Sequence, residues 1–430
     1  MRELFMRLLN GLGMVWSDDF VETVTTDSGG NNMNESPHIL FAGGGTGGHL
    51  MPGAAVARAL QRTDSGAECL FLTTGRDAER ICAEELEGFR SVPVPAARWK
   101  GVVQKLRFCL TAPAAAGRTF DIVRDFGPDM VVGLGGYSCI CPTLTARGMG
   151  CRTMVFESNA IPGRVTRLLA PLVDAVQLQW AEAARHMRAR RCLVTGNPVR
   201  ERVLDADRAA ALREFGLDTD RLTVLVMGGS QGALPLNRML RRALTVLRER
   251  PPAEKSNLQI LHITGPNHLE EARRIRVPSG LIYRPLALTP AMGQVYAASD
   301  VAFCRAGGSS LAELTAVGLP SLLVPLPHAR DDHQKANAAV LEREGAAKCL
   351  SQDELTPGRL ARLVVELGDR PDWLRQMGEE AHRIGRPDAA RKVARHILAM
   401  ARLKSGGDPG SGPDTGEGAD SIVNSLSMAA

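Results

Sequence analysis

The sequence predicts an α/β protein with two doubly wound halves, each a parallel sheet covered by helices, which face one cleft. Apolar segments with strand character alternate with helical patterns along the chain, as in sheets whose crossover connections are helices. Two glycine-rich turns, at 43–48 and 228–233, each follow directly on such a segment. Ligands bind at the carboxyl ends of the strands in this class, so we expect both turns at the cleft.

The apolar segments give four strands in each half. We expect the strands of the first half at 38–42, 69–73, 130–134 and 153–156, and those of the second half at 223–227, 259–264, 301–304 and 321–324. The expected N-terminal domain therefore spans 37–200 and the C-terminal domain 221–404. The charged segment 201–220 lacks strand character and is the expected linker. A long helical pattern over 372–404 closes the fold, and its end is free to return to the first domain.

The two ends differ from the body in composition and charge. Residues 405–430 are rich in Gly, Pro, Ser and Asp and are expected to form a disordered tail. Residues 1–36 are expected to be a disordered or non-native extension, with Met33 as the natural start. Each end carries a net charge of −4 within a chain of +5, so the body carries +13. Such a surplus favours an acidic partner but does not select one.

Cysteine spacing and hydropathy argue against a zinc-binding, a disulfide-rich and a membrane-spanning protein. The nine cysteines include no C-x-x-C pair, so neither a zinc site nor a disulfide framework is expected, and the chain is typical of a reduced, cytosolic protein. The apolar stretches are broken well before the roughly 20 residues that a membrane-spanning helix requires.

The glycine turns point to a phosphate-bearing ligand. A strand that ends in glycines and opens a helix leaves unpaired backbone N–H groups, which favour an anionic group. Neither turn has the Gly-Lys-Ser/Thr ending of a nucleotide-triphosphate loop or the spacing of a dinucleotide site.

A third cluster, at 301–338, adds groups that suit a sugar nucleotide. Ser309 and Ser310 follow a strand and a glycine turn and are expected at helix-capping positions. Glu313, one turn into that helix, is placed to accept hydrogen bonds from ribose hydroxyls. Asp331, His333, Gln334 and Asn337 follow the next strand, and the histidine and the two neutral amides among them suit sugar hydroxyls.

Seven motifs in order carry a resemblance to a known family. They are GGGTGGH (43–49), GGYS (135–138), ESNAIPG (157–163), TGNPVR (195–200), GGSQGA (228–233), RAGGSSLAE (305–313) and PHARDDHQKANA (327–338). With them the chain resembles the MurG family of peptidoglycan glycosyltransferases, over about residues 37–404. Two departures are Ser158, where glutamine is common, and the segment 284–292, which is longer than the family's uracil-contacting stretch.

The resemblance implies a GT-B fold, with two Rossmann-like domains that bind the acceptor and the UDP-sugar. It implies transfer of N-acetylglucosamine from UDP-N-acetylglucosamine to the undecaprenyl-pyrophosphoryl-muramoyl-peptide, lipid I to lipid II, in peptidoglycan synthesis, and hence a part in cell-wall biogenesis, cell shape and division. The residues that we expect to bind substrate are Thr46, Gly47, Gly48, Asn159, Arg200, Ser230, Gly308, Ser309, Ser310, Leu311, Ala312, Glu313, Gln334 and Asn337.

The family's reaction is an inverting, in-line displacement. His49, at the mouth of the first glycine turn, is the candidate base for the acceptor hydroxyl, or else it only orients the turn. Helix-start amides and Arg200 would stabilise the leaving group, and no metal or other cofactor is expected. Three Asp pairs suggest a metal instead: Asp205 with Asp207, Asp218 with Asp220, and Asp331 with Asp332. The first two are better explained as helix caps in the linker, and the third lies in a sugar-binding motif.

The lipid-linked acceptor requires a surface that meets a membrane. The segment 97–110 mixes Arg and Lys with Trp99, Val102, Leu106 and Phe108, which suits an anionic membrane surface. The alternative is an ordinary amphipathic helix packed on the sheet. We therefore expect a peripheral protein at the cytoplasmic face of the inner membrane, without a nucleic-acid partner. Rival functions are another lipid acceptor, a UDP-sugar 2-epimerase and a non-catalytic nucleotide-sugar-binding protein.

Overall fold

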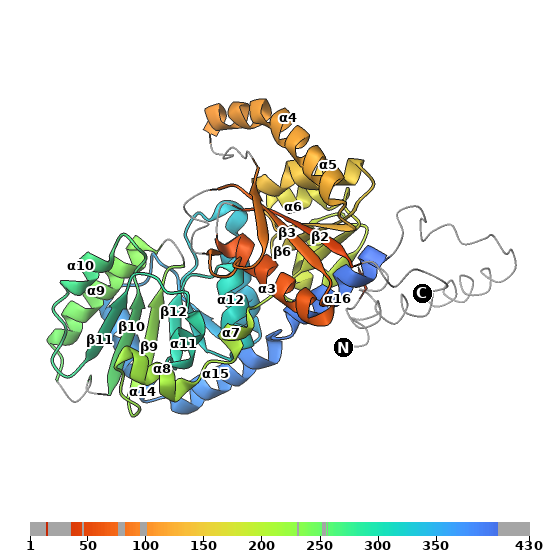
Figure 1. Cartoon of the computed structure of the whole chain (residues 1–430). Coiled ribbons are helices and arrows are strands. Elements are labelled where there is room, and N and C mark those ends of the chain that lie inside the picture. Colours follow the sequence, from red (N-terminus) through yellow and green to blue (C-terminus); the bar gives the residue numbers. More distant parts are fainter. Residues whose placement is uncertain are drawn as a thin grey trace, which may run out of the picture.

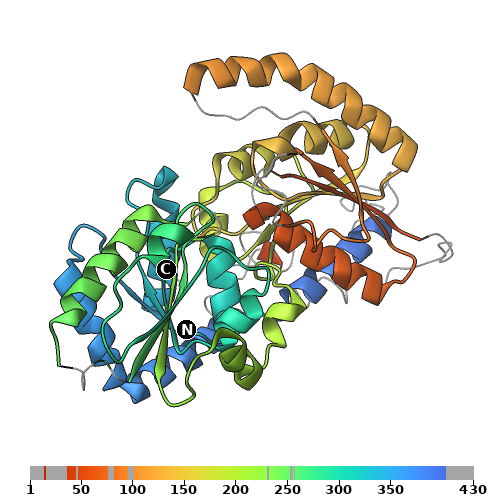
Figure 2. The same ribbon diagram turned by 60° about the vertical axis from the view of Figure 1, so that its left-hand side comes forward.

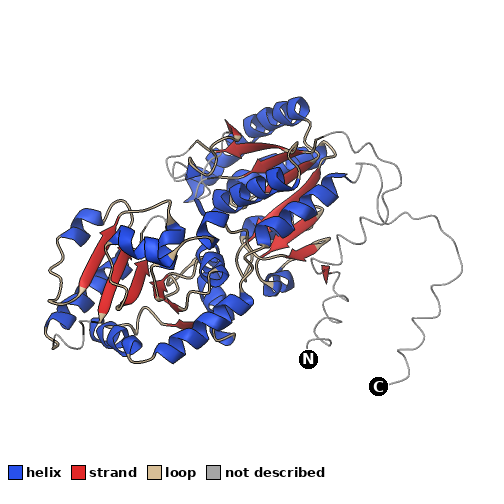
Figure 3. Ribbon diagram, turned by 60° about the horizontal axis from the view of Figure 1, so that its bottom comes forward, coloured by secondary structure: helices blue, strands red, loops and turns tan. Residues whose placement is uncertain are grey.

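The computed structural model describes residues 14–15, 36–44, 47–75, 82–94, 101–229, 232–251, 255 and 257–402, with only the backbone for 14–15, 47, 101–109 and 330. These residues form two α/β halves that lie beside each other (Figure 1). In each half a twisted sheet lies between layers of helices (Figure 3). The predicted fold class is thus confirmed at the level of architecture.

The first sheet is parallel throughout. Its strand order is β1-β8-β7-β6-β5-β2-β3-β4. From the first 36 residues it includes only the two-residue edge strand β1; residues 1–13 and 16–35 lie outside the described chain. The strands are β1 (Met14–Val15), β2 (His38–Ala42), β3 (Glu68–Thr73), β4 (Arg90–Pro93), β5 (Met130–Gly133), β6 (Arg152–Glu157), β7 (Ala175–Leu178) and β8 (Cys192–Val194).

The second sheet is also parallel, in the order β11-β10-β9-β12-β13-β14. Its strands are β9 (Leu222–Met227), β10 (Leu258–Ile263), β11 (Ile282–Leu286), β12 (Val301–Cys304), β13 (Ser321–Leu323) and β14 (Ala347–Cys349). In both sheets the strand order reverses beside the first strand of the half: between β2 and β5, and between β9 and β12. These are the positions where doubly wound sheets bind ligands, and a glycine-rich turn follows each of the four strands.

Alternating side chains on the first sheet fill two cores. Ile39 and Phe41 of β2 point to one face, where they pack with α3 (Gly47–Thr63). Leu40 and Ala42 point to the other face, toward α4 (Gly101–Phe126) and α5 (Ile140–Gly148). This period of two follows from the pleat of the strand. The remaining helices of this half are η2 (Tyr137–Cys139), α6 (Arg164–Leu169) and η3 (Ala181–His186).

The chain crosses between the halves twice. The segment expected as a linker contains α7 (Glu201–Leu204) and α8 (Arg208–Phe215), and its buried residues Val203 and Leu212 pack in the core of the second half. The last helix, α16 (Ala389–Arg402), returns to the first half and packs against α3 (Figures 1 and 2). Its apolar residues Val393 and Ile397 complete the core of the first sheet.

The second half is covered by helices on both faces. It contains α9 (Leu234–Arg248), α10 (Leu269–Arg273), α11 (Met292–Ala297), α12 (Gly308–Ala316), η5 (Arg330–Asp332), α13 (His333–Arg343), α14 (Pro357–Gly368) and α15 (Pro371–Ile384). The helical pattern expected to run unbroken over 372–404 is divided into α15 and α16 at Gly385–Pro387, because proline cannot continue the helix. Residues 403–430, including the expected tail, lie outside the described chain. Within the part of the chain described, no helix combines the length and hydropathy that a bilayer crossing needs.

Candidate active site

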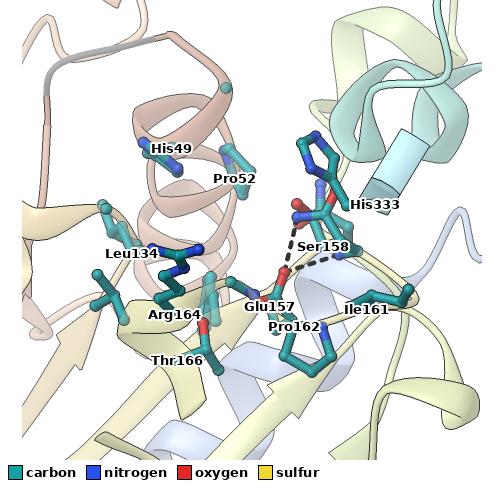
Figure 4. A pocket seen from close by; sticks show the side chains of 18 of the residues that line it. His49, Pro52, Leu134, Glu157, Ser158, Ile161, Pro162, Arg164, Thr166 and His333 are labelled. Atoms are coloured by element: carbon teal, nitrogen blue, oxygen red, sulfur yellow. Dashed lines mark hydrogen bonds between the residues drawn. The ribbon is translucent and has the colours of Figure 1, made fainter. Parts of the chain in front are cut away.

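A cavity of about 510 Å³ opens where the two halves meet. The first glycine turn, the loop after β5 and the loop after β6 supply most of its wall, and Asp331 and His333 come from the second half. Figure 4 shows His49 and Pro52 of α3 facing this space from one side and His333 from the other. The cavity therefore joins elements from both switch points.

His49 lies in the first turn of α3 and is held by two glycines. Gly135 and Gly136 follow β5 with φ of +96° and +72°, and a Cβ on either would come within 3.2 Å of the imidazole. Only glycine adopts this backbone at low cost and also leaves room for the ring. The two glycines of the GGYS motif thus form the surface against which the His49 ring packs.

The environment of His49 keeps the imidazole neutral near pH 7. Burial lowers the pKa of His49 below its ordinary value, although the charge of Glu157 and a hydrogen bond to the Gly44 backbone act in the opposite direction. A neutral imidazole is the form that accepts a proton, so the candidate base is in the state that general-base catalysis needs.

Glu157 shapes the loop that follows β6. One carboxylate oxygen accepts hydrogen bonds from the backbone N–H and the side-chain amide of Asn159, at 2.9 and 2.8 Å. The other oxygen accepts from the Gly163 N–H at 2.8 Å. The first pair is drawn in Figure 4. Because the buried charge is matched by three donors, Glu157 acts as the frame of the 157–163 loop.

Asn337 joins this loop to the second half. Its side-chain oxygen accepts from the Ala160 N–H at 2.8 Å, and its amide nitrogen donates to Asn159 Oδ1 and to the Ala306 carbonyl, both at 3.0 Å. The side chain is fully buried and does not line the cavity. The Asn337 amide therefore links Asn159 and Ala160 of the first half to Ala306 of the second, and a sugar contact at Asn337 stays a prediction.

The start of α12 meets the first glycine turn. Ser309 Oγ donates to the Gly48 carbonyl at 3.0 Å, across the cleft. The expectation that Ser309 and Ser310 cap this helix is wrong: the N-cap is Gly307, and both serines lie inside the first turn. Gly308 is required by space, since a Cβ there would come 2.4 Å from the Ser158 carbonyl. Leu311 and Ala312 are buried, so they offer only backbone to a ligand.

Arg200 lies between carboxylates from both halves. It donates to Glu85 at 2.7 Å and to Glu313 at 2.8 Å, and Tyr296 donates to the other oxygen of Glu313 at 2.8 Å. Burial alone would lower the pKa of Arg200, but the two carboxylates outweigh it and raise the pKa. Burial and Glu313 raise the pKa of Tyr296. The Nε–H of Arg200 is buried without a hydrogen-bond partner in the described chain.

A buried polar chain supports the second glycine turn from behind. His262 contacts the Tyr283 hydroxyl at 2.8 Å and the Asn237 side-chain oxygen at 3.1 Å, and the Asn237 amide donates to the Thr264 carbonyl at 2.8 Å. A Cβ on Gly232 would come 2.4 Å from that carbonyl. Burial lowers the pKa of His262 to about 4, so this histidine is neutral and structural.

The carboxylates that suggested a metal have other partners. Asp207 caps α8 by accepting from the Ala210 N–H at 2.7 Å, and Asp218 accepts from the Asp220 N–H at 3.0 Å. Asp331 pairs with two arginines of α6. Over the described residues, no three His, Cys, Asp or Glu side chains form a group suited to a metal ion.

Two further residues that we expect to bind substrate, Gln334 and Gly47, lie on helices. Gln334 lies on α13, where its side-chain oxygen accepts from the Leu326 N–H at 2.9 Å. Gly47 begins α3. Thr46, Ser230 and Trp99 lie outside the described residues, and the side chains of Val102, Leu106 and Phe108 on α4 are not described.

Sequence reasoning missed Glu85, Tyr296, Asn237 and His262. Glu85 lies in a charged segment that has no motif, and only the fold brings it to Arg200. His262 carried a weak signal, since it is one of two polar residues, with Gln259, in the otherwise apolar run of β10.

Comparison with known proteins identifies the class. Residues 39–178 match the glycosyltransferase family 28 N-terminal domain, and residues 223–393 match the C-terminal domain of the same family. The chain is therefore a glycosyltransferase with the GT-B architecture, as the resemblance predicted.

Individual relatives narrow this class. A UDP-N-acetylglucosamine–N-acetylmuramyl-(pentapeptide) pyrophosphoryl-undecaprenol N-acetylglucosamine transferase of Geobacter sulfurreducens is 36% identical, over 85% of this chain and 99% of the relative. The enzyme of that name from Myxococcus xanthus is 36% identical, over 83% of this chain and 91% of the relative. The crystal structure of Acinetobacter baumannii MurG superposes with a TM-score of 0.64 at 26% identity, over 85% of this chain and 99% of that one. The chain belongs to this family of N-acetylglucosamine transferases, the MurG family.

Proposed function

We propose that this protein transfers N-acetylglucosamine from UDP-N-acetylglucosamine to the lipid-linked N-acetylmuramoyl-peptide, converting lipid I to lipid II. The step belongs to peptidoglycan synthesis, on which cell-wall growth, cell shape and division depend. The observation that carries the proposal is the contact of Ser309 Oγ with the Gly48 carbonyl, 3.0 Å apart. It brings the start of α12 beside the turn that bears His49, so a donor at the helix and an acceptor at the histidine would meet.

The donor diphosphate would bind at the first turn of α12, whose N–H groups have no partner within the helix. Glu313 would accept hydrogen bonds from the ribose, with Arg200 close to the phosphates. In the present structure the Glu313 carboxylate is occupied by Arg200 and Tyr296, so ribose binding would share or replace these donors. Asn159 and Gln334 would contact the sugar. The 201–220 segment divides the acceptor domain from the donor domain in this proposal, with α16 returning to the first.

The reaction would be a single in-line displacement with inversion. The acceptor hydroxyl attacks the anomeric carbon, its proton passes to the neutral imidazole of His49, and UDP leaves with the electron pair of the broken bond. The helix-start amides and Arg200 would stabilise the charge that develops on the leaving phosphate. Each of these groups belongs to this chain, and the proposed sequence uses no metal.

The protein would work at the cytoplasmic face of the cell membrane as a peripheral protein. Support comes from exposed apolar residues on one side of the first half, on α4, α5, α6 and the turn after α6: Leu110, Phe120, Leu144, Leu168 and Leu172. Arg147, on α5, lies on the same helix as Leu144. Apolar side chains beside cations suit an anionic lipid surface.

The test is turnover of the full chain with UDP-N-acetylglucosamine and a short-chain analogue of the muramoyl lipid, in EDTA. We expect UDP release matched by disaccharide product. UDP release without disaccharide would indicate another acceptor or an epimerase. Tight binding of the donor without turnover would favour a non-catalytic nucleotide-sugar-binding protein.

A further inference from the structure

Two arginines of α6 share one carboxylate from the other half of the protein. Arg167 Nη2 lies 2.6 Å from Asp331 Oδ2, and Arg164 Nη2 lies 3.6 Å from Asp331 Oδ1. Arg164 and Arg167 are one helical turn apart, so they share a face of α6. The ion pairs therefore link α6 of the first half to Asp331 of the second, and Arg164 and Asp331 both line the cavity.

The charges at this contact do not balance. Two guanidinium groups face a single carboxylate. Two other acids of this region have partners of their own: Glu157, which lines the same cavity, accepts from Asn159 and Gly163, and Asp332 lies 3.7 Å from Lys335. Arg164 remains 61% exposed and Arg167 38% exposed in their side chains. One positive charge is thus left over, and a ligand with two or more negative charges would suit the pair better than Asp331 does.

The segment that bears Asp331 is held in an unfavourable backbone conformation. His328, Asp331 and Asp332 have φ of +57°, +56° and +50°, and in the described chain these are the non-glycine residues with positive φ. Such a conformation persists only where neighbouring contacts hold it. The partly exposed ion pairs are among those contacts, and exposed pairs of this kind are weak. Loss of the Asp331 contact would therefore let this segment relax.

Arg164 also lies where an acceptor would present its diphosphate, and Arg167 follows one turn later on α6. Arg164 lines the same cavity as His49, Gly135 and Gly136, and Figure 4 shows it on the side of the cavity where His49 and Leu134 lie. In the proposed acceptor the diphosphate and the reacting hydroxyl are carried by one sugar ring. A group that binds the diphosphate must then lie within one sugar of His49, in this cavity.

We propose that Arg164 and Arg167 form the binding site for the diphosphate of the lipid-linked acceptor, and that Asp331 occupies these guanidinium groups until the acceptor displaces it. The inference rests on the proposed function for the identity of the acceptor. The donor diphosphate is separate, since its place is the start of α12. Displacement of Asp331 would also release the 328–332 segment, which leads into α13 and Gln334.

The first experiment compares the full chain with the variant Arg164→Gln/Arg167→Gln, using a soluble short-chain acceptor in detergent. We expect the acceptor KM to rise roughly tenfold or more, which is the loss for at least one charge-assisted hydrogen bond. The KM for UDP-N-acetylglucosamine should stay within about twofold on the same reasoning. Arg188→Gln, an exposed arginine of the same half that does not line the cavity, is the matched control. A rise in the donor KM instead would overturn the assignment.

The second variant, Asp331→Asn, removes the competing carboxylate and keeps the side-chain size. It should lower the acceptor KM, while the double arginine variant raises it. An unchanged or higher acceptor KM in a variant with normal thermal unfolding would refute the role of Asp331 as a stand-in for the ligand.

Inorganic pyrophosphate tests the site without any transfer reaction. Calorimetry should detect binding to the wild type and a loss of at least tenfold in the double arginine variant, even if the wild type fails to use the muramoyl acceptor. Sedimentation with phosphatidylglycerol vesicles tests whether the arginines bind the phosphates of lipid headgroups instead. If the double variant loses vesicle binding while its soluble-acceptor KM is unchanged, the arginines bind lipid headgroups and the proposal is wrong.

Discussion

The guanidinium of Arg200 lies 2.8 Å from the carboxylate of Glu313, and this contact ties the chain that leaves the first sheet to the helix that begins the proposed donor site. Glu85, from the first half, holds the other side of the same guanidinium. A single cation thus links three segments that are far apart in the sequence. If the donor binds at Glu313 as proposed, its binding would be coupled through Arg200 to the packing of the two halves.

Replacement of Glu313 by Gln should raise the KM for UDP-N-acetylglucosamine roughly tenfold, because the ribose would lose a charged hydrogen-bond acceptor. The acceptor KM should change little. Steady-state kinetics with both substrates varied make the measurement, and Glu379→Gln, an exposed glutamate of α15, is the control. Equal increases in both KM values would mean that Glu313 acts on the cleft as a whole.

Replacement of Arg200 by Met should lower the free energy of unfolding by about 3 kcal/mol, since the largely buried carboxylates of Glu85 and Glu313 lose a shared cation. Glu85 keeps only Arg202, and Glu313 keeps only the Tyr296 hydroxyl. Urea unfolding measures this loss. The control, Arg375→Met, removes an arginine from an exposed pair with Asp372 and should change the free energy by no more than about 0.5 kcal/mol. A similar small change at Arg200 would show that its ion pairs with Glu85 and Glu313 stabilise the protein no more than a surface pair does.

His49→Gln should lower kcat by roughly 10²–10⁴-fold if the imidazole takes the acceptor proton. The active form is deprotonated, so kcat/KM should rise with pH through the lowered pKa of His49 and be level through pH 7. The pH profile of the wild type and of the variant makes the test. If kcat/KM of His49→Gln still falls at low pH as in the wild type, another group titrates there and His49 is not the base.

Gly136→Ala should lower kcat more than it lowers stability. Its Cβ would press on the His49 ring at 3.2 Å, and the residue has φ of +72°. Gly150→Ala is a matched control, because Gly150 also has positive φ, +87°, but has open space around its Cβ position. Both variants should lose about 1 kcal/mol of stability from backbone strain. Only Gly136→Ala should lose activity. Equal kcat values in the two variants would contradict a role for Gly136 in positioning the His49 ring.

The buried His262 predicts a pH dependence of stability. Its pKa is lowered to about 4 in the folded protein, so between pH 6.5 and 4 the unfolded chain binds more protons than the folded one. The contribution of His262 to the free energy of unfolding is therefore complete above pH 6.5. It is lost as the pH falls toward 4, by roughly 3 kcal/mol in total. Urea unfolding across this range, compared with His262→Asn, measures the term. A parallel pH dependence in the variant would assign it to other groups.

The sequence predicted best where local chemistry decides the structure. The strands β2 and β12 lie where the apolar runs before their glycine turns predicted them. Short strands such as β8 and β14 were missed, because three residues carry too little periodicity and their pairing partners are distant in the chain. The break between α15 and α16 had a visible signal in Gly385 and Pro387, which the helical pattern on either side concealed.

For the site, motifs predicted which segments meet but not which atoms are used. The first glycine turn and α12 do come together, as Gly48 and Ser309 show. The use of the Asn337 amide between the halves, and the pairing of Glu85 with Arg200, depend on contacts between residues more than 100 positions apart. No pattern within one segment reports such a contact.

The return of α16 to the first sheet sets an order for folding during synthesis. The first half is translated early, yet Val393 and Ile397 of its core are translated after the whole of the second sheet. At usual rates of translation the β2 core stays uncovered on one face for on the order of tens of seconds. During that time the apolar side chains of α3 that later pack against α16 are exposed to solvent unless a chaperone covers them. The core of the first half is thus completed only after the second half has been synthesised.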